Sequence, residues 1–184
     1  GKTVISKMTA EEVYENALNW AKEYDNELYE MLQDKEYSLR VFGIERGNKK
    51  PRKDIAKWSD VKNSIIYMYD NKFLDNDISY EYAKISDKEE VNKLLKSYIE
   101  EYFDINDDKD KWFGKIKDLA EKNGYAREVK EFKANPEKYP GHVGDVSTVI
   151  RVALTGRQNT PDMYEIMEVL GKDSVIKRLN KAIN

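Results

Sequence analysis

The sequence predicts an all-α protein built from two packed helical subdomains, residues 1–105 and 106–184. Apolar residues recur every three or four positions through most of the chain, which is the spacing of a helix with one buried face. Capping-box patterns, in which a Thr or Ser precedes a Glu by three positions, begin at Thr9 and Ser86. No segment alternates apolar and polar residues as a half-buried strand does, so the pattern favours helical bundles over a sheet.

The composition indicates a soluble, helix-rich globular protein and excludes several kinds of site. Of the 184 residues, 40% are hydrophobic and 36% are charged, with a net charge of −3. No apolar run reaches the roughly 18 residues of a membrane span, and no signal peptide is recognisable. The chain has no Cys and a single histidine, His142, which leaves little basis for a zinc site or a catalytic dyad. We expect a cytoplasmic protein with no metal site.

The first subdomain is expected to consist of short helices, each with one apolar side. The helix that Thr9 opens should run through Tyr24. Residues 71–85 fit either a long connection or a shorter helix with loops. Gly1 in place of Met predicts that the chain begins at a cut point in a longer protein. The other helices expected here are 26–33, 37–45, 59–70 and 86–102.

The acidic run at residues 104–110 interrupts the helical pattern, and we place the subdomain boundary there. Asp110 is expected to cap the next helix. Gly156 stands where a left-handed residue would end a helix that follows the turn-rich segment at 136–144. The last helix should start at Asp173. The other helices expected in this half are 110–122, 125–134 and 146–154.

A basic cluster at residues 49–57 is the first candidate for contacts with nucleic acid. Five of the ten residues from 49 to 58 are Lys or Arg, and Trp58 adds an aromatic ring. Because Pro51 favours a break between two helices, these side chains should project from a helix end. Such a cluster could bind phosphates or bases. A solvated helix end explains it as well on composition alone.

A second candidate is the segment 151–167, which has the pattern of two helices joined by a short turn. Thr160 is predicted to cap the second helix, with Pro161 at its first position and Asp162 complementing its dipole. Arg151 lies on an otherwise apolar helix, where it would contact a ligand or extend past its neighbours to a carboxylate. The carboxylates considered for that pairing are Asp145 and Glu165.

The amino-acid sequence of this segment is distinctive. Residues 151–156 read Arg-Val-Ala-Leu-Thr-Gly, residues 160–161 read Thr-Pro, and residues 169–172 read Val-Leu-Gly-Lys. In this order and spacing, the segment resembles the C-terminal anticodon-binding region of bacterial glutamyl-tRNA synthetases. The family has an apolar and an aromatic residue after Thr-Pro or Ser-Pro, often Leu and Phe, where this chain has Met163 and Tyr164. The resemblance is dense over roughly the last forty residues and thinner upstream.

The resemblance implies a helical module that binds the anticodon loop of tRNA. Arg52, in a Pro-Arg pair followed two positions later by Asp54, matches an arginine that reads the anticodon from the first subdomain. An unpaired base needs a flat apolar face and donors for its edge. Ordinary core positions are the alternative for Met163 and Tyr164. The residues matching the family's anticodon contacts in the second subdomain are Arg151, Thr160, Pro161, Met163 and Tyr164.

The resemblance also implies that the catalytic part of the synthetase is missing from this chain. The family's Rossmann-type nucleotide-binding domain carries a His-Ile-Gly-His signature, which needs two histidines in one tetrapeptide, and this chain has one in total. We therefore expect no catalytic residue and no cofactor here. ATP and magnesium would bind to the catalytic domain joined in cis. The alternative function is a helical adaptor for another protein, which the 13 Tyr residues suggest.

Overall fold

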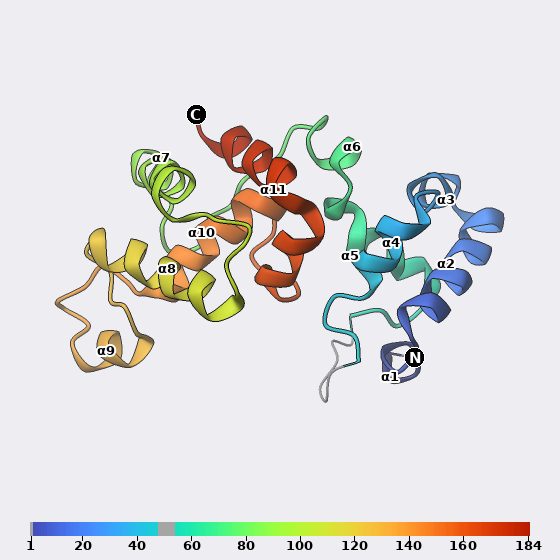
Figure 1. Cartoon of the computed structure of the whole chain (residues 1–184), viewed down its shortest axis with the longest axis horizontal. Coiled ribbons are helices and arrows are strands. Elements are labelled where there is room, and N and C mark those ends of the chain that lie inside the picture. Colours follow the sequence, from blue (N-terminus) through green and yellow to red (C-terminus); the bar gives the residue numbers. More distant parts are fainter. Residues whose placement is uncertain (1, 48–53) are drawn as a thin grey trace. The chain divides into compact units, whose positions relative to one another are not determined.

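The structure, a computed structural model, describes residues 2–47 and 54–184 (Figure 1). Within these ranges the chain is helical, and its β-type pairing is limited to one isolated parallel bridge between Ala126 and His142. The predicted all-α class is confirmed. The α-helices are α1 (Lys2–Ser6), α2 (Ala10–Tyr24), α3 (Asn26–Met31), α4 (Lys35–Phe42), α5 (Val61–Ile65), α6 (Asp70–Phe73), α7 (Lys88–Ser97), α8 (Lys109–Lys122), α9 (Val129–Ala134), α10 (Val143–Thr155) and α11 (Met163–Ala182). Three short elements are η1 (Trp58–Asp60), η2 (Ile66–Met68) and the π-helical η3 (Tyr98–Tyr102).

The chain forms two compact units, which are not continuous in sequence. Unit 1 comprises Gly1–Asn76 and Pro161–Val169, and unit 2 comprises Asp77–Thr160 and Leu170–Asn184. This division differs from the expected halves, because residues 77–105 belong to unit 2. There α7 packs against α10, and η3 packs against α8. The acidic run that suggested a boundary is therefore a loop inside unit 2.

Unit 1 contains α2, which Thr9 caps, and this helix packs against α3 and α4 (Figure 1). The predicted capping box is present. The Thr9 hydroxyl accepts the Glu12 amide at 3.1 Å, and the Glu12 carboxylate accepts the Thr9 amide at 3.1 Å. The hydroxyl of buried Tyr14 donates to the Leu32 carbonyl at 2.7 Å, which ties α2 to the end of α3.

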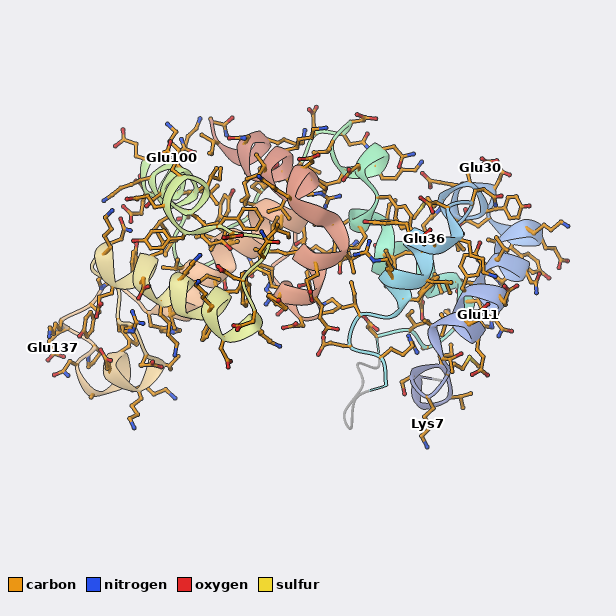
Figure 2. The ribbon with its side chains drawn as sticks, viewed as in Figure 1. Lys7, Glu11, Glu30, Glu36, Glu100 and Glu137 are labelled. Carbon is orange, nitrogen blue, oxygen red and sulfur yellow. The ribbon has the colours of Figure 1, made fainter. Side chains whose placement is uncertain are left out.

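Charged side chains cover the outside of unit 1 and cross-link some of its helices. Figure 2 shows Glu11 and Glu30 at the periphery of α2 and α3, where both are exposed. Lys62 on α5 lies 3.0 Å from the Asp25 carboxylate and 3.2 Å from that of Glu27. Because Asp25 also caps α3 by accepting the Leu28 amide, this cluster fixes the start of α3 against α5.

Unit 2 is built around α10, which contacts α7 and α8. Val149, Ile150, Ala153 and Leu154 along this helix are each at most 1% exposed. Because α10 packs against more than one helix, it needs apolar residues on more than one side, which explains its apolar sequence. α10 therefore forms the core of unit 2, and its two ends determine where the adjoining turns lie.

The turn predicted at residues 136–144 leads into a capping box whose cap is the single histidine. Nδ1 of His142 accepts the Gly144 amide at 2.9 Å, and the Asp145 carboxylate accepts the His142 amide at 2.9 Å. A Cβ at Gly144 would lie 2.6 Å from the imidazole, so a larger residue there would displace the His142 side chain from this box. The histidine has a structural role in this arrangement, as the cap of α10.

Two helices of unit 2 begin at a different residue from the one expected. Asp87, and not Ser86, accepts the backbone amide three positions ahead, at 3.1 Å, at the start of α7. Asp108, and not Asp110, does the same at 2.8 Å at the start of α8. In both places the sequence offers two neighbouring capping residues. The carboxylate that is used also complements the positive end of the helix dipole.

Residues 2–47 and 54–184 include no helix that is both long enough and apolar enough to cross a membrane. α11 contains a break close to Asp173, the residue at which the sequence predicted the start of a separate last helix. Gly171, inside α11, has φ of +82° and ψ of 164°, which is far from helical values. Such backbone angles are accessible essentially to Gly alone.

Candidate nucleic-acid interface

Hydrogen bonds hold the end of α10 and the turn that follows it. Gly156 has φ of +72°, and its amide donates to the Val152 carbonyl at 2.7 Å. The Thr155 hydroxyl donates to the Arg151 carbonyl at 2.7 Å and accepts the Arg157 amide at 3.1 Å. The predicted left-handed helix end at Gly156 is confirmed, and the turn beyond it starts from a fixed backbone.

Arg151 is half-buried on α10, and its guanidinium reaches this turn. Nη1 donates to the Thr160 hydroxyl and lies 3.5 Å from the Thr160 carbonyl oxygen. Thr160 itself is 8% exposed. Unit 2 thus brings together two residues that the sequence assigned to one site. This bond holds the planar guanidinium in a defined orientation at the turn.

The next helix starts later than the sequence predicted. α11 begins at Met163, and Asp162 acts as its cap because Oδ2 accepts the Glu165 amide at 3.2 Å. Thr160 is therefore not the capping residue, since its hydroxyl accepts the guanidinium described above. Pro161 precedes the cap and does not occupy the first helical position. The Thr-Pro-Asp sequence contains two possible caps, and the carboxylate is the one used.

The two residues expected to face a ligand after the Thr-Pro pair differ in exposure. Met163 is 2% exposed, so the alternative of an ordinary core position describes it. Tyr164 is half-buried and keeps part of its surface accessible. Met163 supports the first turn of α11 from the inside, whereas Tyr164 can offer an aromatic surface.

Glu45, which the sequence did not single out, contacts the start of α11 within unit 1. Its backbone amide donates to the Glu165 carboxylate at 3.3 Å. Its carboxylate accepts the backbone amide of Asp162 at 2.9 Å. These partners lie 120 and 117 residues away in sequence, which explains why no local pattern indicates them.

Arg46, the next residue, is also bonded to backbone. Its guanidinium donates to the carbonyls of Phe42 and Ile5, at 2.8 Å each. Burial lowers the pKa of Arg46, while the nearby Asp54 carboxylate acts in the opposite direction. Both side chains line a pocket of unit 1 that combines apolar and charged groups. The residues lining this pocket are Val41, Phe42, Ile44, Glu45, Arg46, Asp54, Ile55, Ser64, Ile65, Tyr67, Met68 and Pro161.

Arg52 and the first part of the basic cluster at 49–57 lie outside the described residues. The end of that cluster is described: Lys57 is exposed, and Trp58 begins η1. The Asp60 carboxylate accepts the amides of Ala56 and Lys57 at 3.1 and 3.2 Å. Among residues 2–47 and 54–184, no group of three or more acidic or histidine side chains could hold a metal ion.

The predicted site residues thus fall into three sets. Arg151 and Thr160 are hydrogen-bonded in unit 2. Pro161, Met163 and Tyr164 belong to unit 1, at the start of α11. The third set is Arg52, outside the described part of the chain.

Residues 130–183 match the family model described as an anticodon binding domain. They include α10, α11 and the turn between these helices at residues 156–162, which Arg151 contacts (the Arg151 turn). The match covers the C-terminal third of the chain. The turn between Gly156 and Tyr164 lies in the middle of the matched region.

The wider comparison extends over nearly the whole chain. The chain is 43% identical to the glutamate–tRNA ligase of Acetivibrio thermocellus over 183 residues, which cover 99% of this chain and 33% of that protein. It is 44% identical to the glutamate–tRNA ligase of Clostridium perfringens strain SM101 over 184 residues, covering 98% and 33%. The corresponding protein of Sorangium cellulosum is 41% identical over 179 residues, covering 97% and 31%. The resemblance to the anticodon-binding region of glutamyl-tRNA synthetases is therefore confirmed, and the chain spans about a third of the length of the curated relatives it matches.

Proposed function

We propose that the chain recognises the anticodon of tRNA as part of a glutamate–tRNA ligase, and so selects the tRNA that receives glutamate. The observation that carries this proposal is the position of the Arg151 turn. It lies inside the region that matches an anticodon binding domain, in a chain whose full length resembles glutamate–tRNA ligases. The ATP-dependent, magnesium-dependent glutamylation would take place in a catalytic domain joined in cis, in the cytoplasm.

We infer a different role for each of the site residues. Arg151, held by Thr160, would donate to the edge of an unpaired base, the kind of contact that discriminates between bases by about 1–3 kcal/mol. Tyr164 would stack on a base, a contact worth about 1–3 kcal/mol. Buried Met163 would keep the turn in place beneath Tyr164. Arg52 would read a further base from unit 1.

Phosphate contacts would come from lysines around these residues, and they should make binding depend on salt. Each neutralised phosphate releases counterions, so affinity falls as the salt concentration rises. The net charge of −3 does not oppose this, since a local basic surface is what attracts the RNA backbone. Base contacts and phosphate contacts can therefore be separated by experiment.

The direct test is a titration of this chain with two RNA stem-loops at two salt concentrations. One stem-loop carries the anticodon of a glutamate tRNA, and the other carries a changed anticodon base in the same stem. We expect tighter binding of the first at both salt concentrations and weaker binding of both at the higher one. Equal affinity for the two stem-loops would contradict the proposal.

One surface feature favours the alternative of a protein-binding adaptor. Tyr24 at the end of α2 is 65% exposed, and its ring lies 5.6 Å from that of Trp20. Trp20 itself is half-buried, and aromatic side chains at a surface are enriched in protein interfaces. If neither stem-loop binds, this pair is the first surface to test for a protein partner.

A further inference from the structure

The first turn of α11 has a capping box that another part of the chain has entered. In an ordinary capping box, the cap side chain accepts the amide of the third helical residue, whose side chain accepts the amide of the cap. The first half is present, since Asp162 accepts the Glu165 amide at 3.2 Å. In the second half, Glu45 stands between the partners. It donates its own amide to Glu165 at 3.3 Å and accepts the Asp162 amide at 2.9 Å.

Glu45 makes these two bonds from an unfavourable backbone conformation. Its φ of +50° is the only positive value among the described residues other than Gly. For an L-residue with a long side chain, this left-handed conformation is disfavoured and persists only where the surroundings hold it. A Gly at this position would adopt it freely. The hydrogen bonds of the Glu45 carboxylate and backbone amide hold this backbone conformation. The carboxylate bond explains why a Glu and not a Gly stands at this position.

Glu45 also connects two segments that the proposed function needs. On one side it bonds the turn at residues 161–164, which carries Pro161 and Tyr164. On the other side it continues directly into Arg46 and the chain that leads to Arg52. Glu45, Arg46 and Pro161 line the same pocket of unit 1. A single residue therefore joins the start of α11 to the segment that precedes the basic cluster.

We infer that Glu45 is a positioning residue for anticodon recognition: by completing the capping box of α11, it fixes the turn at 161–164 against residues 45–47. This inference rests on the proposed function. Glu45 does not itself contact RNA. It determines where Pro161 and Tyr164 lie, so its loss should reduce discrimination between anticodons without a comparable loss of helix content.

Three variants of the full 184-residue chain separate this role from a general effect on stability. Glu45→Gly removes the carboxylate while tolerating the positive φ, so any defect comes from the lost side-chain contacts and not from strain. Glu45→Gln keeps an oxygen that can accept the Asp162 amide. Arg40→Ala is the matched control, because Arg40 also links α4 to α11 by donating to the Glu168 carbonyl at 3.0 Å, but away from the first turn.

The first readout is the ratio of affinities for the matched and base-changed anticodon stem-loops. A variant that only unfolds part of the population lowers both affinities by the same factor and leaves this ratio unchanged. We expect Glu45→Gly to lower the ratio by about tenfold or more, the size of one lost base contact. Glu45→Gln and Arg40→Ala should stay within about twofold of the wild-type ratio on the same scale.

The second readout needs no RNA. Hydrogen exchange of the Asp162 amide, measured by NMR, should become faster in Glu45→Gly than in wild type, and should remain slow in Glu45→Gln and Arg40→Ala. A wild-type ratio of one would overturn the proposed function. A discriminating wild type with an equally discriminating Glu45→Gly variant would overturn only the positioning role, and unchanged exchange at Asp162 would overturn its structural basis.

Discussion

The guanidinium of Arg178 is completely buried and donates a 3.0 Å hydrogen bond to the carbonyl oxygen of Leu154. Leu154 is in the last turn of α10, where backbone carbonyls have no partner within the helix. A buried cation at this end also complements the negative end of the helix dipole. Arg178 additionally donates from Nε to the Ser174 hydroxyl at 3.0 Å. This arginine therefore holds the end of α10 from which the Arg151 turn departs.

Replacing Arg178 by Met should destabilise the chain by roughly 1–3 kcal/mol, because the substitution fills most of the volume but leaves buried acceptors without a donor. Urea unfolding followed by circular dichroism measures the change. Lys177→Met is the matched control, since the neighbouring Lys177 is exposed and its loss should have little effect. Equal stability of the Arg178→Met variant and the control would show that the buried bond to Leu154 contributes nothing.

Arg151→Ala should relax discrimination at one anticodon base by about 1–3 kcal/mol while leaving helix content unchanged. The reason is that Arg151 is half-buried at the surface of α10 and bonds a turn residue, not the core. Thr160→Val keeps the shape of Thr160 but removes the acceptor, so it should cause a smaller loss of the same discrimination. Binding titrations with the two stem-loops measure both, and far-UV circular dichroism checks the fold. Wild-type discrimination in Arg151→Ala would place the base contact elsewhere.

The sequence was sufficient for the fold class and for many helix ends, because these depend on residues close together in the chain. The Thr9 capping box and the Gly156 helix end follow from local patterns of this kind. Where two candidate caps were adjacent, as at Asp87 and Ser86, the local pattern did not distinguish them. Such choices depend on which neighbouring backbone amide the folded helix presents.

The division into units and the role of Glu45 could not be predicted in the same way. Both depend on residues at 161–169 returning to unit 1, far from the rest of that unit in sequence. The burial of Met163 likewise depends on this segment belonging to unit 1. The sequence did not predict it, because an apolar side chain suits a core and a ligand surface equally well. The resemblance to a family indicated Arg151 and Thr160 as site residues, and the structure adds that they are hydrogen-bonded to each other.

Gly171→Ala should destabilise the chain by about 1–3 kcal/mol, because φ of +82° with ψ of 164° is a region that only Gly occupies readily. Steric contact is not the cause, since a Cβ at Gly171 would meet no atom within 4 Å. Gly114→Ala in α8 is the matched control: it also has open space, but in a regular helix. That variant should be stabilised by about 0.5–1 kcal/mol. Thermal unfolding of both variants tests this opposite pair of signs.

The ion-pair cluster at the start of α3 should make stability fall in acid. Burial raises the pKa of Asp25, but hydrogen bonds from Lys62 and the Leu28 amide outweigh it, so the pKa lies below its ordinary value of 3.8. Hydrogen bonds from Lys72 and Lys62 lower the pKa of Glu27 below 4.5. A group with a depressed folded-state pKa stabilises the protein above its unfolded pKa, and this stabilisation is lost as the pH falls through the folded value.

We therefore expect the free energy of unfolding to decrease as the pH falls from about 5 towards 2, as these carboxylates become protonated. Lys62→Met removes a partner of both acids, so it should lower stability near neutral pH and flatten the decrease in acid. Lys57→Met changes the same charge on an exposed lysine just before η1 and serves as the control. The measurement is urea unfolding at a series of pH values. Parallel pH profiles for wild type and Lys62→Met would contradict the assignment of the acid response to this cluster, because the response would then come from carboxylates that Lys62 does not contact.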